Sequence, residues 1–131
     1  SDAPAATNAH ERLAREIYAE LVALPTTARS GTTAAAEALA ARFRAAGFDA
    51  SDVVLAGPSP DKQNLVVRLR GRAPRPAVGY LTHLDVVEAL PEAWTVPPFE
   101  LTERDGWFYG RGALDTKNSA AVLAATLLRL K

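Results

Sequence analysis

Helical and strand-like patterns alternate along the 131-residue chain, and this alternation limits its fold more than any other feature. Leu13, Ile17 and Leu21 recur at helical spacing until Pro25 ends the run, and an alanine-rich helix is expected over residues 34–46. Short apolar runs rich in Val, Leu and Phe follow, bounded by Gly and Pro. Helices that alternate with short strands predict an α/β sandwich.

Local signals predict where these elements begin and end. Asn8 followed by Glu11 predicts an N-cap with a carboxylate three residues later, and therefore the start of the first helix. Asp105-Gly106 between two apolar runs predicts a tight hairpin turn. Residues 1–7 are expected to form a disordered lead-in. The remaining expected elements are strands at 48–55 (broken by the GPSP at 57–60), 64–69, 77–82, 99–104 and 107–109, and a buried helix at 117–130, packed for instance against the sheet.

The composition excludes several classes of site and partner. Lys+Arg and Asp+Glu number 15 each, so neither a nucleic acid nor a membrane surface is predicted as a partner, and no apolar run is long enough to span a bilayer. Cysteine is absent, so any metal must be held by His, Asp or Glu, which suits zinc or manganese at a hydrolytic centre. The compartment stays open between the cytoplasm and the periplasm or secretion.

The stretch YLTHLDVV at 80–87 places a histidine two residues before a carboxylate. In an extended chain, residues i and i+2 face the same side, so His83 and Asp85 suit a metal-bound imidazole whose second nitrogen donates to a carboxylate. A partly buried histidine beside a turn-forming aspartate is the alternative. The position of His83 at the carboxyl end of the expected strand 77–82, before a long proline-containing loop at 84–98, favours a site.

Asp115 stands where a strand gives way to a loop, directly before the last helix. A carboxylate there can bridge the two cations of a two-metal hydrolase, although capping of the helix is the alternative. Other motifs fail: the third glycine of a dinucleotide-binding fingerprint is replaced by Asp115, and no Gly-x-Ser-x-Gly elbow exists. Asp115-Thr116 also lacks the glycine of an aspartic protease motif.

Three segments in this order and spacing resemble the first half of the catalytic domain of M20-family metallopeptidases: THLDVV at 82–87, WTVPPF at 94–99 and GWFYGRGALDTK at 106–117. The family includes carboxypeptidase G2-like enzymes, aminoacylases, and acetylornithine and succinyl-diaminopimelate deacylases. The resemblance implies a three-layer, zinc-exopeptidase-like α/β sandwich with a mixed, mostly parallel sheet. It also implies zinc-dependent hydrolysis of amide or peptide bonds in small peptides or N-acyl amino acids.

Carried over position by position, the resemblance implies a metal site at three residues. His83 would be a terminal ligand of one zinc, Asp115 would bridge two zinc ions, and Asp85 would be the catalytic-site partner that orients His83. The peptide bond between Asp115 and Thr116 is commonly cis in the family. The chain departs from the family at Thr82, where glycine is usual, and at Asn118-Ser119, where Gly-Gly is common; these departures leave the ligand positions intact.

The resemblance further implies that residues 8–131 are only the N-terminal portion of a catalytic domain. In the family, a Glu-Glu pair with the general base, a further acidic ligand, a lid or dimerisation domain and a final ligand histidine follow this helix, whereas this chain stops at Lys131. The intact enzyme is expected to hold two zinc ions, or manganese or cobalt, and to form a homodimer. This fragment is expected to bind metal poorly and to be inactive. A non-catalytic binding domain on the same scaffold, and a structural domain with a coincidental H-x-D, stay open as alternatives.

Overall fold

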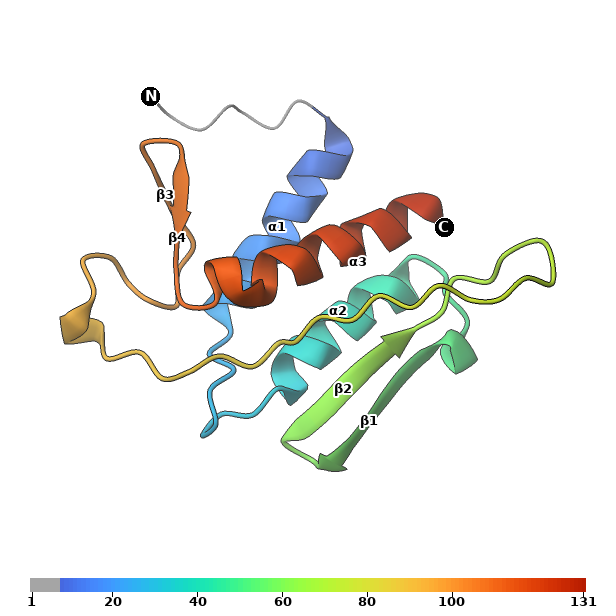
Figure 1. Ribbon diagram of the computed structural model, residues 1–131, viewed down its shortest axis with the longest axis horizontal. Helices are drawn as coiled ribbons and strands as arrows, with labels where there is room; N and C mark the ends of the chain where they lie inside the picture. The colour runs from blue at the N-terminus through green and yellow to red at the C-terminus, as the bar shows by residue number, and fades with distance from the viewer. Residues whose placement is uncertain (1–7) are drawn as a thin grey trace.

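The structure, a computed structural model, describes residues 8–131, so the expected lead-in at 1–7 lies outside the described residues. Three helices and two short hairpins make up the fold (Figure 1). No helix within residues 8–131 combines the length and the apolar character needed to cross a membrane. In chain order the elements are α1 (Ala9–Ala23), α2 (Thr33–Ala45), β1 (Val53–Ser59), β2 (Lys62–Val67), β3 (Thr102–Arg104), β4 (Trp107–Tyr109) and α3 (Asn118–Leu130).

Helix α1 begins at the predicted cap. The backbone N–H of Glu11 donates to Asn8 Oδ1 at 2.9 Å, and Asn8 Nδ2 donates to the Glu11 carboxylate at 3.2 Å. The helix ends at Ala23, two residues before Pro25, and Ile17 and Leu21 on its apolar face are fully buried. Both predicted ends of this helix are therefore confirmed.

Helices α1 and α3 cross and pack directly against each other (Figure 1). The face of α3 at this contact is made of small side chains, which allow the two backbones to approach closely. Buried in it are Ala120, Ala121, Ala124 and Ala125. The sequence predicted a buried helix here, and that is confirmed. Its principal partner is α1, however, and not the sheet suggested by the sequence.

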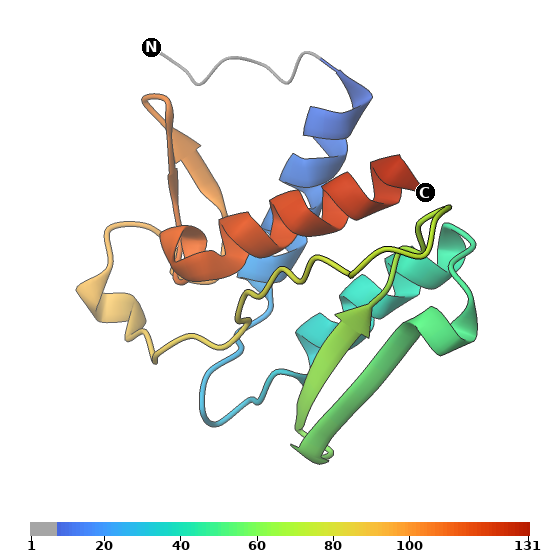
Figure 2. The same cartoon turned by 45° about the vertical axis from the view of Figure 1, so that its right-hand side comes forward.

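Helix α2 covers one face of the β1–β2 hairpin (Figure 2). Val53 pairs with Val67 and Leu55 with Leu65, and these four side chains join the core with Phe43 of α2. Val54 and Val66 pair on the opposite face, where both are exposed. The alternation along the two strands thus separates a core face from an open apolar face.

The boundaries predicted for this hairpin were wrong by several residues. β1 begins at Val53, because residues 50–52 form a single 3-10 turn, and it continues through the GPSP segment to Ser59 instead of breaking there. The pairing is irregular between Ala56 and Ser59, which is how an edge strand accommodates Pro58. β2 begins at Lys62 and ends at Val67, two residues earlier at each end than the expected strand at 64–69.

The strand predicted at 77–82 is not formed within residues 8–131. The segment is extended but pairs with no other strand, and Val78, Tyr80 and Leu81 are 78%, 75% and 96% exposed. Figures 1 and 2 show it running between α3 and the α2–hairpin unit. A compact apolar run favours an extended backbone, but a ladder also requires a partner strand.

The fold is α/β, as predicted, but its two described sheets are both antiparallel hairpins. The hairpin turn at Asp105-Gly106 is confirmed: both residues have positive φ, 55° and 84°, between β3 and β4, although β3 is shorter than the expected strand at 99–104. Edge-to-face contact between Phe108 and Tyr18, with ring centroids 5.5 Å apart, attaches this hairpin to α1. Parallel pairing is not seen in the described part of the chain.

Candidate functional site

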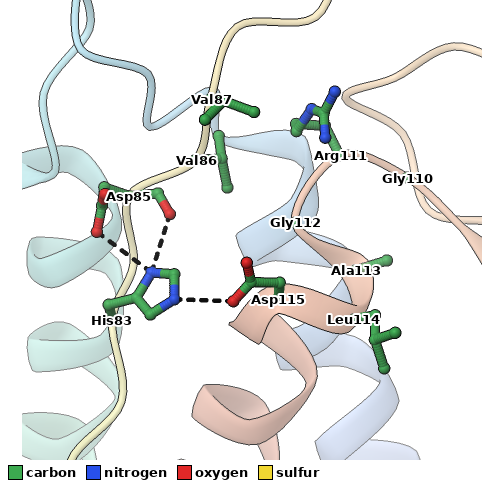
Figure 3. Close-up of a pocket in the computed structure, with 10 residues that line it drawn as sticks. All are labelled: His83, Asp85, Val86, Val87, Gly110, Arg111, Gly112, Ala113, Leu114 and Asp115. Carbon is green, nitrogen blue, oxygen red and sulfur yellow. Dashed lines mark hydrogen bonds and ion pairs between the residues drawn. The ribbon is translucent and has the colours of Figure 1, made fainter.

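His83, Asp85 and Asp115 come together at one pocket, although Asp85 and Asp115 are 30 positions apart in the sequence (Figure 3). Nε2 of His83 lies 2.9 Å from Oδ1 of Asp115, at hydrogen-bond distance. Nδ1 of the same ring lies 3.1 Å from the backbone carbonyl of Asp85 and 3.2 Å from its carboxylate. Asp115 therefore contacts one ring nitrogen of the imidazole, and Asp85 contacts the other.

The three side chains are open to solvent. They are 47%, 71% and 84% exposed for His83, Asp85 and Asp115 respectively. The hydrogen bond between His83 and the Asp115 carboxylate raises the pKa of His83, because the carboxylate favours the charged imidazolium. Exposure on this scale leaves the Nε2 and carboxylate atoms accessible to a ligand from the pocket.

The pocket has a volume of about 340 Å³ and extends from His83 and Asp115 to the Gly110–Gly112 segment. Arg111 lies across it from His83 (Figure 3), and its guanidinium stacks over Trp94, 5.0 Å from the ring centroid. Nε of Arg111 is buried and has no hydrogen-bond partner among residues 8–131. Trp94 belongs to the long proline-containing loop, so that loop supports one wall of the pocket.

Asp115 lies in a tight turn between β4 and α3. Gly112 opens the turn with φ of 76°, the backbone N–H of Lys117 donates to the Gly112 carbonyl at 3.0 Å, and the expected cis bond at Asp115-Thr116 is confirmed. Helix α3 begins at Asn118 with Lys117 as its N-cap residue. The Asp115 carboxylate instead contacts His83, so helix capping does not account for it.

Comparison with known proteins adds independent evidence on the motifs. Residues 79–131 match the family described as "Peptidase family M20/M25/M40". The chain is 46% identical over 92 residues to succinyl-diaminopimelate desuccinylase of Methylorubrum extorquens, which covers 68% of this chain and 23% of that protein. The chain belongs to the M20 peptidase family.

Other M20 relatives cover shorter or longer parts of the chain. Succinyl-diaminopimelate desuccinylase of Delftia acidovorans is 36% identical over 115 residues, 86% of this chain and 29% of that protein. The N-fatty-acyl-amino acid synthase/hydrolase PM20D1 of Xenopus tropicalis is 66% identical over 38 residues, 29% of this chain and 7% of that protein. The chain thus spans less than a third of the length of each of these relatives.

In this M20 chain, His83 and Asp115 fit two ligands of one metal ion. Two ligand atoms on a tetrahedral zinc, with bonds of about 2.0–2.1 Å, lie about 3.3 Å apart. The observed separation of 2.9 Å between Nε2 and Oδ1 is within half an ångström of that value. Asp85 occupies the other ring nitrogen, which is the arrangement that directs Nε2 toward a metal. No group of three or more His, Cys, Asp or Glu side chains able to hold a metal occurs in residues 8–131.

Sequence reasoning missed two buried polar residues that anchor the segments carrying His83 and Asp115. Lys117 is fully buried, and its Nζ donates to the carbonyls of Leu21 and Leu24 at 2.7 Å each. Burial lowers its pKa to about 8. Thr26, three residues after the end of α1, donates from its hydroxyl to the carbonyl of Leu84. The available signal in the sequence was a lysine at the start of a largely apolar helix. That signal does not indicate which carbonyls the lysine side chain contacts.

Proposed function

We propose that this chain supplies His83 and Asp115 as ligands of a dinuclear zinc centre in an M20 enzyme that hydrolyses amide bonds. One observation carries the proposal: the imidazole Nε2 and the carboxylate face each other at 2.9 Å on the wall of an open pocket. The remaining ligands and the general base would come from outside residues 8–131, because a zinc ion takes about four ligands and two converge here.

The residues of this chain have separable roles in the proposed centre. Asp85 accepts from Nδ1, so it holds the imidazole in the tautomer whose Nε2 is free to bind metal. Asp115, with two carboxylate oxygens, can contact two cations at once. When bound, zinc, or manganese or cobalt in its place, would polarise an amide carbonyl and lower the pKa of water.

We infer that the substrates are small N-acyl amino acids or peptides. Two kinds of relative support this class, since their names describe action on N-fatty-acyl amino acids and on succinyl-diaminopimelate. A pocket of about 340 Å³ also suits a small molecule better than a folded protein.

The proposal includes a larger, mostly parallel sheet in the full-length protein. Within residues 8–131, the extended segment at 77–82 pairs with no strand and exposes three apolar side chains, as an unpaired strand of such a sheet would. The exposed Val54 and Val66 on the open face of the β1–β2 hairpin add to the apolar surface that such a sheet would bury.

Matched substitutions in the full-length protein test the proposal. His83→Ala and Asp115→Asn should each abolish zinc-dependent hydrolysis of N-acyl amino acids and dipeptides. The chain offers a control for each: His10→Ala changes its other histidine, and Asp105→Asn changes an exposed turn aspartate whose positive φ asparagine also tolerates. Both controls should retain wild-type turnover.

Two outcomes would contradict the proposal. Turnover that survives both His83→Ala and Asp115→Asn would remove these residues from the centre. Zinc binding by the wild-type protein without turnover of any acylated amino acid or dipeptide would favour a non-catalytic binding domain on the same scaffold.

A further inference from the structure

We propose that the C-terminal end of α1 is the template that sets the distance between His83 and Asp115, with Lys117 and Thr26 as its two positioning residues. This inference rests on the proposed metal centre and names the residues that keep its two ligands at a fixed separation. Neither residue touches the pocket, so each would act through the segment that it anchors.

Lys117 anchors the Asp115 side. It lies two residues after Asp115, is fully buried, and donates from Nζ to the carbonyls of Leu21 and Leu24 at 2.7 Å each. These carbonyls belong to the last turn and cap of α1, where the helix dipole favours a cation, and that of Leu21 also accepts from the backbone N–H of Leu24 at 3.3 Å. The ammonium therefore adds two donors at this end of the helix and ties the Asp115 turn to α1.

Thr26 anchors the His83 side from the same end of α1. Its hydroxyl donates to the carbonyl of Leu84, and its own carbonyl accepts from the backbone N–H of Val86 at 2.9 Å. These two contacts fall on either side of Asp85, the residue that holds the His83 ring. Thr26 is only 1% exposed, so solvent does not compete for these bonds.

His83 and Asp115 cannot fix the distance between them by their own contact. Their mutual contact is solvent-exposed, and exposed charged pairs hold side chains only weakly. Two further links join the two segments directly: the Thr116 hydroxyl donates to the carbonyl of His83 at 3.1 Å, and the Thr82 and Thr116 hydroxyls lie 2.8 Å apart. Buried hydrogen bonds to a common helix end resist displacement better than the exposed pair does. Breaking them would leave buried donors and acceptors without partners.

The test uses the full-length protein and four variants. Lys117→Met removes the ammonium at similar length, Thr26→Val removes the hydroxyl at similar shape, and Thr26→Ser restores it. Ile17→Val is the structural control, because Ile17 is fully buried in α1 but contributes no polar bond to either segment. Zinc affinity of the metal-free protein is measured by calorimetry, thermal unfolding by circular dichroism, and kcat and KM with an N-acyl amino acid.

Lys117→Met and Thr26→Val should each weaken zinc affinity by about 10–100-fold, the range seen when outer supports of metal ligands are removed. Both should lower kcat more than they change KM. Thr26→Ser should recover most of the wild-type affinity. Ile17→Val should lower the melting temperature while leaving zinc affinity within about twofold, because it removes packing only.

The outcomes separate this inference from the proposed function. If the wild-type protein binds no zinc, both the proposed function and this inference are contradicted. If the wild-type protein binds zinc and Thr26→Val binds it as tightly as wild type, the positioning role is contradicted while the proposed function stands. The same follows if Thr26→Ser binds zinc as weakly as Thr26→Val. If Lys117→Met fails to fold, the Thr26 pair decides the result by itself.

Discussion

Replacing Gly112 by alanine should push apart the two segments that carry the candidate ligands. Gly112 opens the Asp115 turn with φ of 76°, and a Cβ added there would lie 2.4 Å from Cγ1 of Val86. Val86 is itself almost fully buried and is fixed to Thr26 through its backbone N–H, so it has little room to retreat. The substitution therefore combines backbone strain with overlap at the wall of the pocket.

The magnitude follows from these two terms. A left-handed backbone costs an alanine about 1–2 kcal/mol relative to glycine. Overpacking of a well-filled site adds about 1–3 kcal/mol. Gly112→Ala should thus lower the free energy of unfolding by about 2–5 kcal/mol. Gly47→Ala is the matched control, because Gly47 has φ of 80° and nothing within 4 Å of an added Cβ, so only the first term applies.

Urea denaturation followed by circular dichroism measures both losses, and zinc calorimetry of the same variants measures the effect on the site. Gly112→Ala should exceed Gly47→Ala by about 1–3 kcal/mol and should also weaken zinc binding, whereas Gly47→Ala should leave zinc binding unchanged. Equal losses of stability in the two variants would refute the predicted contact with Val86.

Three further predictions concern stability and metal binding. Asn8→Ala removes the cap of α1 and should cost about 1 kcal/mol in urea denaturation; no measurable loss would contradict the capping contacts. Ala121→Leu should cost about 1–3 kcal/mol by overpacking the α1–α3 contact, while the neighbouring Val122→Leu, on an exposed face, should stay within about 0.5 kcal/mol. Calorimetry of residues 1–131 should show only weak zinc binding, because two candidate ligands converge in the described part; tight two-site binding would disprove this.

Features encoded by a few adjacent residues could be predicted from the sequence. The Asn8–Glu11 cap, the Asp105-Gly106 turn and the start of α3 near Lys117 depend on local backbone preferences, and the structure has all three. The H-x-D spacing likewise placed His83 and Asp85 together, because side chains two apart in an extended chain share a face.

Features that depend on distant partners could not be predicted in this way. The segment at 77–82 has the composition of a strand, but pairing depends on another strand being beside it. The alanine face of α3 indicates burial without saying whether a helix or a sheet covers it. The anchoring of Lys117 and Thr26 is equally non-local, since their partners lie 93–96 and 58 residues away in the chain.

Anomalous scattering at the zinc edge, from crystals of the full-length protein soaked with zinc, would locate the metal relative to His83 and Asp115. We expect a zinc peak about 2.0–2.2 Å from both Nε2 of His83 and a carboxylate oxygen of Asp115, with Nδ1 of His83 still bound to Asp85. Zinc held entirely by other side chains, with the His83–Asp115 hydrogen bond left as it is, would contradict it.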